Sequence, residues 1–358
     1  MKPLIIIYLL FIAAMCSCSP RDGADCGHIE CNGVYYWKTV MQLDPGERDF
    51  MKRHRVGRIY LRMFDVKADA RGYSRGTFER VAPNASMRIA KGDRRTTVDS
   101  LNSRLVVPVV YVTLEALSTA KGQEGELAAL IVERVRRMCS YNELISVEGL
   151  QLDCDWTPST EQSYFALCDS ARAQIALKDL HWSLSSTIRL HQLSHKAPPV
   201  DYGVLMVYNT GNFSDPNAKN SIIDLSDVEQ YLGYLDDYPL HLDVAYPTYS
   251  WQLLFRRMKF LGLMNGVNVA DTTRFAPLGD HSHRALCDVI HKGKIIYKGD
   301  IVRTEKSTPS EVRAVKEAIE SHLHDRPHSN ILYHLDYQNL SEYSADEINS
   351  IYSAGKRD

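Results

Sequence analysis

The sequence has no excess of charge of either sign, because 42 Lys and Arg residues stand against 44 Asp and Glu residues. A chain with a formal net charge of −2 lacks a general basic surface for phosphates, so we expect no nucleic-acid partner. Cysteine is also scarce, since 8 in 358 residues are too few for a fold built on disulfides. With 20 Gly and 14 Pro, the composition is neither collagenous nor disordered. The function must therefore depend on local sites.

The amino terminus has the pattern of an export signal. Met1-Lys2-Pro3 precedes an apolar run of about twelve residues, which is too short for a membrane-spanning helix. We predict a signal peptide over residues 1–17. The following Cys16-Ser17-Cys18-Ser19 resembles a bacterial lipobox, in which Cys18, next to the small Ser17, is the better lipidation site. The alternative is an ordinary signal peptide that is cut near this point.

Lipidation at Cys18 would make the chain an exported lipoprotein, held at the outer membrane or cell surface by a tether over residues 18–32. Export also favours a small disulfide loop between Cys26 and Cys31. His28 lies between them, but no second Cys/His pair follows closely, so we expect no metal and no cofactor. We expect the protein to be a monomer.

Apolar strand-like segments alternate with amphipathic helical ones along the rest of the chain. A buried parallel strand is the best interpretation of LVVPVVYVT at residues 105–113. Eight such strands with helices between them predict a (β/α)8 TIM barrel over residues 33–358, a length that such barrels often reach as one unit. An open doubly wound sheet is the alternative, but no Gly-x-Gly-x-x-Gly follows the first strand. The predicted strands are residues 34–37, 58–64, 105–113, 147–156, 182–190, 204–208, 240–245 and 331–335.

Two stretches exceed a minimal barrel. We predict a long loop over residues 66–104, with nine Lys and Arg against four Asp and Glu. It would leave the carboxyl end of the second strand, where barrel active sites form, and could meet an acidic or sulfated ligand or simply be solvated. The other stretch is an insertion after strand seven, at about residues 251–307. We predict a hairpin at residues 294–302, with a turn at Lys298-Gly299-Asp300.

The fourth strand carries the most informative polar residues. Because side chains alternate along a strand, Gln151, Asp153 and Asp155 share one face, while Leu150, Leu152 and Cys154 share the other. In a barrel the polar set points inward, with Asp155 nearest the carboxyl end. Two carboxylates about 7 Å apart influence each other's ionisation, so one can serve as a general acid.

This strand resembles the signature of family 18 glycoside hydrolases, the chitinases and endo-β-N-acetylglucosaminidases, which reads Asp-Gly-φ-Asp-φ-Asp-x-Glu with φ apolar. Glu148-Gly149 corresponds to Asp-Gly, Gln151 to the first strand-face Asp and Asp153 to the second. Asp155 takes the place of the Glu that acts as general acid. The resemblance implies that Asp155 and Asp153 are the catalytic positions and that Gln151 lies in the substrate site.

Two further segments support the resemblance in the expected order. Met206-Val207-Tyr208-Asn209 is similar to the sixth-strand motif Met-x-Tyr-Asp, whose Tyr contacts the acetamido group of the substrate. Residues 242–251, which end at Trp251, resemble the seventh strand and its following loop. The implied substrate-binding residues are therefore Met206, Tyr208, Asn209 and Trp251. Arg189, at the carboxyl end of strand five, could bind substrate or form an ion pair with Asp153 or Asp155.

Departures from the family pattern affect the chemistry. Asp155 is one methylene shorter than Glu, which withdraws its proton by about 1.5 Å, and a misplacement of about 1 Å can cost a hundredfold in rate. Gln151 cannot ionise, so it cannot share a proton with Asp153. Residues 333–336 lack the Trp that forms the floor of the family's acetamido pocket.

These features leave three hypotheses. The first is a surface-anchored glycoside hydrolase acting on N-acetylhexosamine-containing or related glycans, with Asp155 as the acid, Asp153 orienting and Tyr208 contacting the acetamido group. The second is a catalytically inactive lipoprotein that binds oligo- or polysaccharide in the same cleft. The third is an adhesion or scaffold protein that uses the basic loop.

Overall fold

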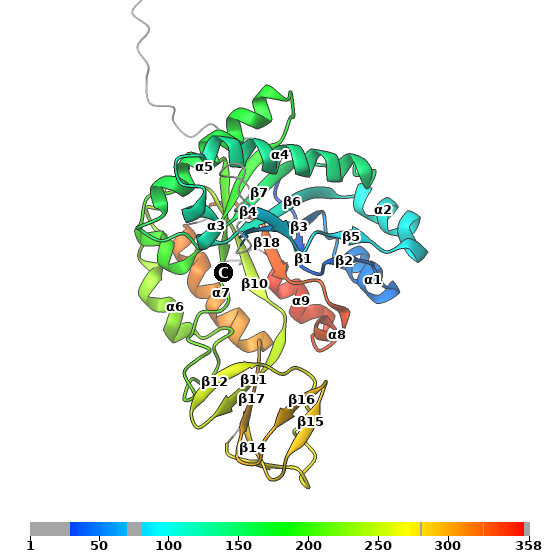
Figure 1. The fold of residues 1–358 in the computed structure, drawn as a ribbon, viewed down its shortest axis with the longest axis vertical. Coiled ribbons are helices and arrows are strands. Elements are labelled where there is room, and N and C mark those ends of the chain that lie inside the picture. Colours follow the sequence, from blue (N-terminus) through cyan, green and yellow to red (C-terminus); the bar gives the residue numbers. More distant parts are fainter. Residues whose placement is uncertain (1–28, 70–80, 280, 325, 354–358) are drawn as a thin grey trace, which may run out of the picture.

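Eight parallel strands form a closed barrel in the computed structural model, which describes residues 29–69, 81–279, 281–324 and 326–353 (Figure 1). Pairing of β1 with both β3 and β18 closes the ring. This closure confirms the predicted (β/α)8 TIM barrel and excludes the open sheet. The signal peptide, Cys18 and Cys26 lie outside the described residues. The barrel strands are β1 (Gly33–Tyr36), β3 (Arg58–Ala68), β6 (Leu105–Val112), β7 (Gly149–Asp153), β8 (Ser183–Arg189), β9 (Tyr202–Met206), β10 (Leu242–Pro247) and β18 (Asn330–Tyr333).

Alternation along the strands separates an outer core from an inner one. Leu150, Leu152 and Cys154 pack outward against the helices, as their parity predicts. Tyrosines fill much of the interior, where the rings of Tyr35 and Tyr60 stack at 4.8 Å. The barrel interior is packed with side chains. We call the carboxyl end of the strands the mouth and the opposite end the base.

Helices cover the outside of the barrel between the strands. Their ends carry local signals, for example a capping box between Asp44 and Glu47 at α1 and another between Thr308 and Glu311 at α7. Among the described residues, the connection from β8 to β9 has only a 3-10 helix, η3 (Leu190–Ser194). No helix in the described ranges is long and apolar enough to span a membrane. The helices are α1 (Pro45–Arg53), α2 (Arg94–Asn102), α3 (Leu114–Thr119), α4 (Glu124–Tyr141), α5 (Glu161–Leu177), α6 (Leu225–Leu232), α7 (Pro309–Leu323), α8 (Tyr337–Leu340) and α9 (Ala345–Tyr352).

The segment predicted as one long loop, residues 66–104, contains regular structure in its described part. β4 (Val81–Asn84) pairs antiparallel with β3, and β5 (Arg88–Ile89) pairs with β2 (Val40–Met41). After η2 (Lys91–Asp93) the chain forms α2, which buries only Thr97, Val98 and Leu101. Three buried positions among polar neighbours give too short an apolar stripe for the periodicity to show. Residues 70–80 lie outside the described part.

The insertion after strand seven forms a separate β lobe below the barrel in Figure 1. Its five-stranded sheet has the order β12-β11-β17-β14-β13, and β15 and β16 form a hairpin beside it. The predicted hairpin is wrong: residues 294–296 pair with residues 289–291, while residues 301–306 pair with β11 and β14. The strands are β11 (Ser250–Arg256), β12 (Lys259–Leu263), β13 (Phe275–Pro277), β14 (Ser282–Ala285), β15 (Val289–His291), β16 (Lys294–Ile296) and β17 (Ile301–Lys306).

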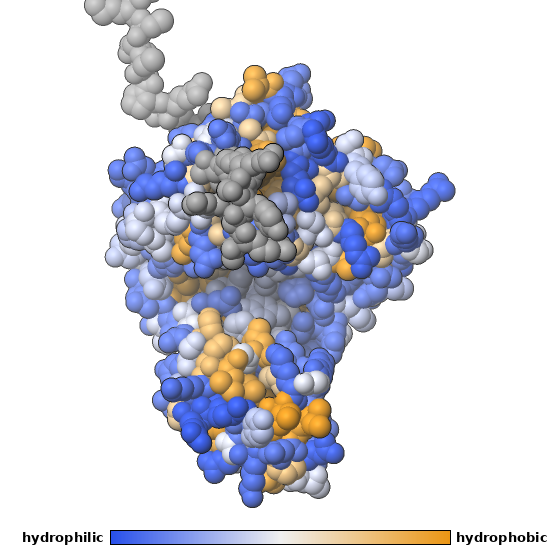
Figure 2. All heavy atoms as spheres, in the orientation of Figure 1, coloured by the Kyte–Doolittle hydropathy of each residue, from blue (hydrophilic) through white to orange (hydrophobic). Residues whose placement is uncertain are grey.

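The lobe has its own hydrophobic core, which includes Leu254, Phe275 and Val302. Figure 2 shows that hydrophobic side chains also gather on its surface. Buried Arg303 ties the lobe to the loop after β9 by donating to the carbonyl oxygens of Asp215, at 2.6 Å, and Phe213, at 3.3 Å. The lobe therefore fixes the course of that loop.

Candidate functional site

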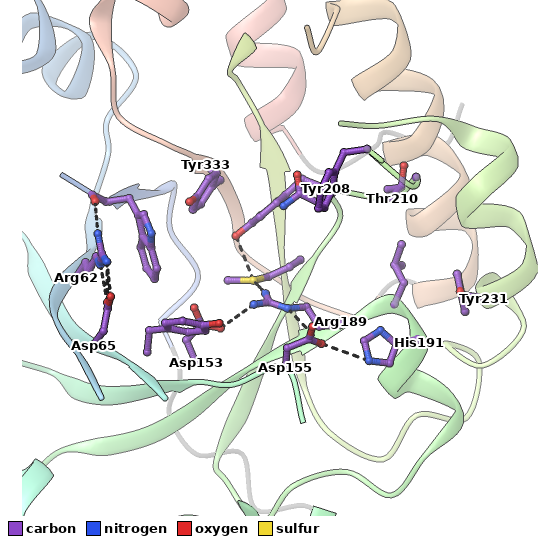
Figure 3. A pocket seen from close by; sticks show the side chains of 17 residues that line it. Arg62, Asp65, Asp153, Asp155, Arg189, His191, Tyr208, Thr210, Tyr231 and Tyr333 are labelled. Carbon is purple, nitrogen blue, oxygen red and sulfur yellow. Dashed lines mark hydrogen bonds and ion pairs between the residues drawn. The ribbon is translucent and has the colours of Figure 1, made fainter. Parts of the chain in front are cut away.

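A cavity of about 500 Å³ opens at the mouth of the barrel. Its walls come from the carboxyl ends of β1, β3, β6, β7, β8, β9 and β18, where the strand order brings residues distant in sequence together (Figure 3). It is lined by Trp37, Arg62, Asp65, Tyr111, Asp153, Asp155, Arg189, Leu190, His191, Met206, Tyr208, Asn209, Thr210, Gly211, Phe213, Tyr231 and Tyr333.

Aromatic rings form one continuous wall of this cavity. Tyr333 stacks on Tyr208 with ring centroids 4.3 Å apart, and Trp37 lies 5.9 Å from Tyr333. Tyr208 donates to the Met206 sulfur at 3.1 Å, and burial raises its pKa well above the usual value, so the hydroxyl remains a donor. A row of ring faces of this kind can pack against the apolar face of a sugar.

Charged groups form the facing wall. Buried Asp153 accepts hydrogen bonds from the Thr187 hydroxyl at 2.7 Å and from Arg189 Nη2 at 3.0 Å. Asp155 follows β7 and its side chain is 52% exposed. Its Oδ1 lies 3.4 Å from His191 Nε2 and 4.0 Å from Arg189 Nε (Figure 3). Both carboxylates are thus engaged by nitrogen donors.

Arg189 is the centre of this charged wall. Its guanidinium also contacts the Met206 sulfur, so it lies across the cavity between β7 and β9. Burial by itself would lower the Arg189 pKa, but the nearby Asp153 carboxylate outweighs it and the pKa is raised. Arg189 is therefore a permanent cation between the two carboxylates.

A second ion pair lies near Trp37. Arg62 donates to both oxygens of Asp65, from Nε at 3.0 Å and from Nη2 at 2.8 Å. The same guanidinium lies 5.2 Å from the centre of the Trp37 ring and donates to the Trp37 carbonyl at 3.3 Å. These contacts hold the indole at the cavity wall.

Comparison with sequence families and with curated proteins finds no match. Comparison with solved structures finds several similar folds. The spore cortex-lytic enzyme SleL of Bacillus cereus aligns with a TM-score of 0.53 and 9% identity, over 92% of this chain and 76% of SleL. A chitinase of Chromobacterium violaceum aligns at 0.51 and 11% identity, over 88% and 98%. The family 18 chitinase ChiB of Flavobacterium johnsoniae aligns at 0.50 and 12% identity, over 90% and 94%.

The chain has a family 18 glycoside hydrolase-like barrel. The resemblance inferred from three short motifs is thereby confirmed for the fold. At these identities the comparison carries the fold alone, so the chemistry has to be argued from the residues of this cavity.

The family 18-like motif residues divide into those that line the cavity and those that do not. Asp153, Asp155, Met206, Tyr208 and Asn209 line it, together with Arg189. Of the two roles predicted for Arg189, the ion pair with Asp153 is present, and the side chain also lines the cavity. Asn209 has a φ of 54°, a left-handed conformation that Asn tolerates. Its side chain accepts from the Tyr249 hydroxyl at 2.6 Å.

Two predicted substrate-binding residues lie away from the cavity. Gln151 is fully buried one step deeper in the barrel, where Tyr35 donates to its oxygen at 2.7 Å. It supports the cavity floor from below, because an inward-facing residue near the middle of a strand is covered by the interior packing. Trp251 is carried into the lobe by β11, where it packs against Phe213 at 6.3 Å and donates to Glu305 at 2.7 Å. It lies behind the cavity wall.

Several lining residues received no specific prediction. Arg62 and Asp65 belong to the second strand, and Tyr111 to the third, which sequence analysis treated as packing elements. Alternation alone would place Arg62 and Asp65 on opposite faces of the strand, and a register irregularity between Arg62 and Phe64 accompanies their meeting in the cavity. Phe213 and Tyr231 had no signal, because they reach the cavity from a loop and from helix α6 and not from a barrel strand.

Metal binding finds no support in this cavity. In the described part of the chain, no group of three His, Cys, Asp or Glu side chains has a metal-binding arrangement. Cys139, Cys154 and Cys168 are buried, and burial raises the pKa of Cys139 and of Cys168 to about 12, which makes these thiols unreactive.

Proposed function

We propose that this protein binds oligosaccharides containing N-acetylhexosamine in the cavity at the barrel mouth, and that it does so without the hydrolysis of family 18 enzymes. The aromatic wall of Trp37, Tyr333 and Tyr208 faces a wall of charged hydrogen-bonding groups. A sugar ring has an apolar face and a polar edge, so both walls can be used at once. The motif positions of Met206 and Tyr208 favour a ligand with an acetamido group.

The observation that carries this proposal is the position of Arg189 between Asp153 and Asp155. A general acid must present a proton to the glycosidic oxygen, whereas Asp153 already accepts from Thr187 and Arg189, and Asp155 faces the same guanidinium. Asp155 also has the shorter side chain. The two carboxylates therefore serve better as hydrogen-bond acceptors for sugar hydroxyls than as the acid machinery of a hydrolase.

A second candidate function is glycoside hydrolysis with Asp155 as the proton donor. It is favoured by the exposure of Asp155 in the cavity and by the nearby imidazole of His191, whose Nε2 lies 3.4 Å from Asp155 Oδ1. Both functions use the same cavity. A measurement of binding therefore cannot distinguish them, but a measurement of product release can.

We further propose that the chain is an exported monomer, held at the outer membrane or cell surface by a lipid on Cys18. The sequence of residues 1–20 supports this proposal. A sugar-binding protein in this position would hold polysaccharide close to the cell.

The test is to measure binding by titration calorimetry and product release by chromatography with oligomers of N-acetylglucosamine and N-acetylgalactosamine. We expect binding without products for the wild type, a loss of about tenfold in affinity for Tyr208→Ala, and binding within threefold of wild type for Asp155→Asn. The matched control is Asp179→Asn, an exposed carboxylate at the barrel base.

Products from the wild type that disappear in Asp155→Asn, but persist in Asp179→Asn, would establish the hydrolase instead. Neither binding nor products with any oligomer would contradict both functions and leave the barrel as a scaffold.

A further inference from the structure

The described end of the predicted tether, residues 29–32, is hydrogen-bonded to the base of the barrel. The Ile29 carbonyl accepts from Arg58 Nη2 at 2.8 Å, and the Cys31 amide donates to the Ser329 hydroxyl at 3.2 Å. The Asn32 carbonyl accepts from the amides of Gly57, at 2.9 Å, and Arg58, at 3.2 Å. All these partners precede or begin barrel strands. The first described residues are therefore attached to the end opposite the cavity.

The attachment of residues 29–32 involves a buried charge network. Arg58 is fully buried and pairs with Glu148 at 2.8 Å and with Asp243 at 3.7 Å. Asp243 in turn accepts from the Ser329 amide at 2.7 Å. A charge network of this kind is costly to open, so the point where the tether leaves the barrel is fixed.

The loops at the base also expose large apolar side chains. Ile145, before β7, is 83% exposed, and Leu177, before the neighbouring β8, is 78% exposed. Tyr141 is exposed at the end of α4, with the Arg94 guanidinium 5.7 Å from its ring centre. Tyrosine, aliphatic side chains and Arg together are the residue types that lie at the headgroup level of membranes.

We infer that the base of the barrel faces a lipid bilayer, with Tyr141, Ile145 and Leu177 at the headgroup level, and that the sugar cavity faces away from it. This inference rests on the lipid anchor at Cys18 proposed above. The partner is a lipid surface because the lipidated residue is joined to this face by a short stretch of chain.

The length of the stretch from Cys18 to Ile29 limits which face of the barrel can meet the membrane. Cys18 is eleven residues from Ile29, which spans at most about 40 Å when fully extended. Helix α4 has 18 residues and is about 27 Å long, so it runs most of the height of the barrel and ends at the base. To bring the mouth to the membrane, the tether would have to run along the outside of the barrel for at least about 27 Å of its reach of about 40 Å, whereas the base can meet the membrane without this detour.

Amide hydrogen exchange tests this orientation on the lipidated full-length chain, with and without vesicles of phosphatidylethanolamine and phosphatidylglycerol. We expect exchange to slow at least threefold in residues 141–146 and 177–181 when vesicles are present. Exchange in residues 157–160 and 191–194, at the mouth, should stay unchanged. An N-acetylhexosamine oligomer that binds the free chain should bind the vesicle-bound chain equally well.

A variant pair tests whether the exposed apolar residues matter. The double variant Ile145→Glu with Leu177→Glu should lose the protection of both loops and leave vesicles several times faster than wild type. The matched control is Ile290→Glu, because Ile290 is 78% exposed but lies on the lobe hairpin, and it should behave as wild type.

The outcomes separate this inference from the anchor on which it rests. A vesicle-bound lipidated chain that is protected at the mouth, or that keeps its protected base loops in the double variant, would overturn the inference and leave the anchor intact. A full-length chain that carries no lipid and does not bind vesicles would overturn both, while sugar binding in solution would be unaffected.

Discussion

The barrel has an arginine between two carboxylates at each end, and the two centres differ in what surrounds them. At the base, Arg58 is sealed from solvent between Glu148 and Asp243 and also donates to Ser329 and the Ile29 carbonyl. At the mouth, Arg189 pairs with buried Asp153, but its second partner, Asp155, is exposed in the cavity. A guanidinium whose hydrogen bonds are all buried stabilises the fold. A guanidinium that faces a cavity can in addition bind a ligand.

The largest expected effect comes from breaking the base centre. Arg58→Met should lower the free energy of unfolding by about 3–5 kcal/mol, because fully buried Asp243 and partly buried Glu148 both lose their arginine partner. Chemical denaturation followed by circular dichroism measures this. Sugar affinity, measured at a temperature where the variant is folded, should remain within threefold of wild type. A loss of stability below about 1 kcal/mol would show that water reaches this centre.

The corresponding change at the mouth should have a smaller effect on stability and a larger one on binding. Arg189→Met should cost about 1–3 kcal/mol, because Asp153 keeps its hydrogen bond from Thr187. Sugar affinity should fall at least threefold. Combining it with Asp153→Asn should recover part of the lost stability, since the unpaired charge is removed. Equal effects of the Arg58 and Arg189 substitutions on binding would contradict the distinction between the two ends.

The aromatic wall provides a third comparison, between an indole in the cavity and one behind it. Trp37→Ala should weaken oligosaccharide binding about tenfold, equivalent to about 1.4 kcal/mol. Trp251→Phe keeps a ring against Phe213 and should leave the affinity within twofold of wild type. Calorimetric titration of both variants measures this. If the Trp251 variant lost more affinity than the Trp37 variant, the assignment of the cavity wall would be wrong.

The smallest expected effect is the pH dependence of stability that comes from His328, at the base of the barrel. Burial works to lower the pKa of His328, but its contacts with Glu320 and with the Arg326 carbonyl outweigh burial and the pKa is raised. The folded state therefore holds this proton more tightly than the unfolded state. The stabilisation is fully present below the unfolded value near 6.5 and is lost as the pH rises through the raised value.

Denaturation between pH 5.5 and 8.5 should accordingly show a falling stability that is reduced in His328→Gln. Sugar binding should not follow the same profile in this variant, because His328 lies at the base. An unchanged stability profile in the variant would assign the pH dependence to other groups.

The sequence predicted the barrel because its signals are local and repeated. Each strand of Val, Ile and Leu indicates its own burial, and alternation along residues 149–155 separates the inward Asp153 from the outward Leu152. The depth at which a residue lies in the barrel cannot be predicted from its neighbours in sequence. Gln151 and Asp153 have the same parity, yet only Asp153 reaches the cavity, because the interior tyrosines determine where the packing ends.

The position of Trp251 depended on long-range contacts in the same way. Its place next to a strand motif suggested the cavity, but the chain turns at residues 249–250 into a lobe whose sheet order joins strands far apart in sequence. Arg62 and Asp65 have opposite parity, so their place in one site depended on a register irregularity between Arg62 and Phe64. Phe213 could not be placed from its own segment, because contacts with the distant Arg303, Trp251 and Phe260 hold its loop.

Buried Arg303 has a consequence for how the shape of the cavity can change. It attaches the loop bearing Phe213 to the lobe through two backbone carbonyls, so this attachment does not depend on the side chains of the loop. The Phe213 ring adds a second attachment, because it packs against Trp251 and Phe260 of the lobe. A substitution inside the lobe can therefore reshape one wall of the cavity from a distance. If the cavity binds the proposed oligosaccharide, its selectivity will depend partly on lobe residues that do not line the cavity.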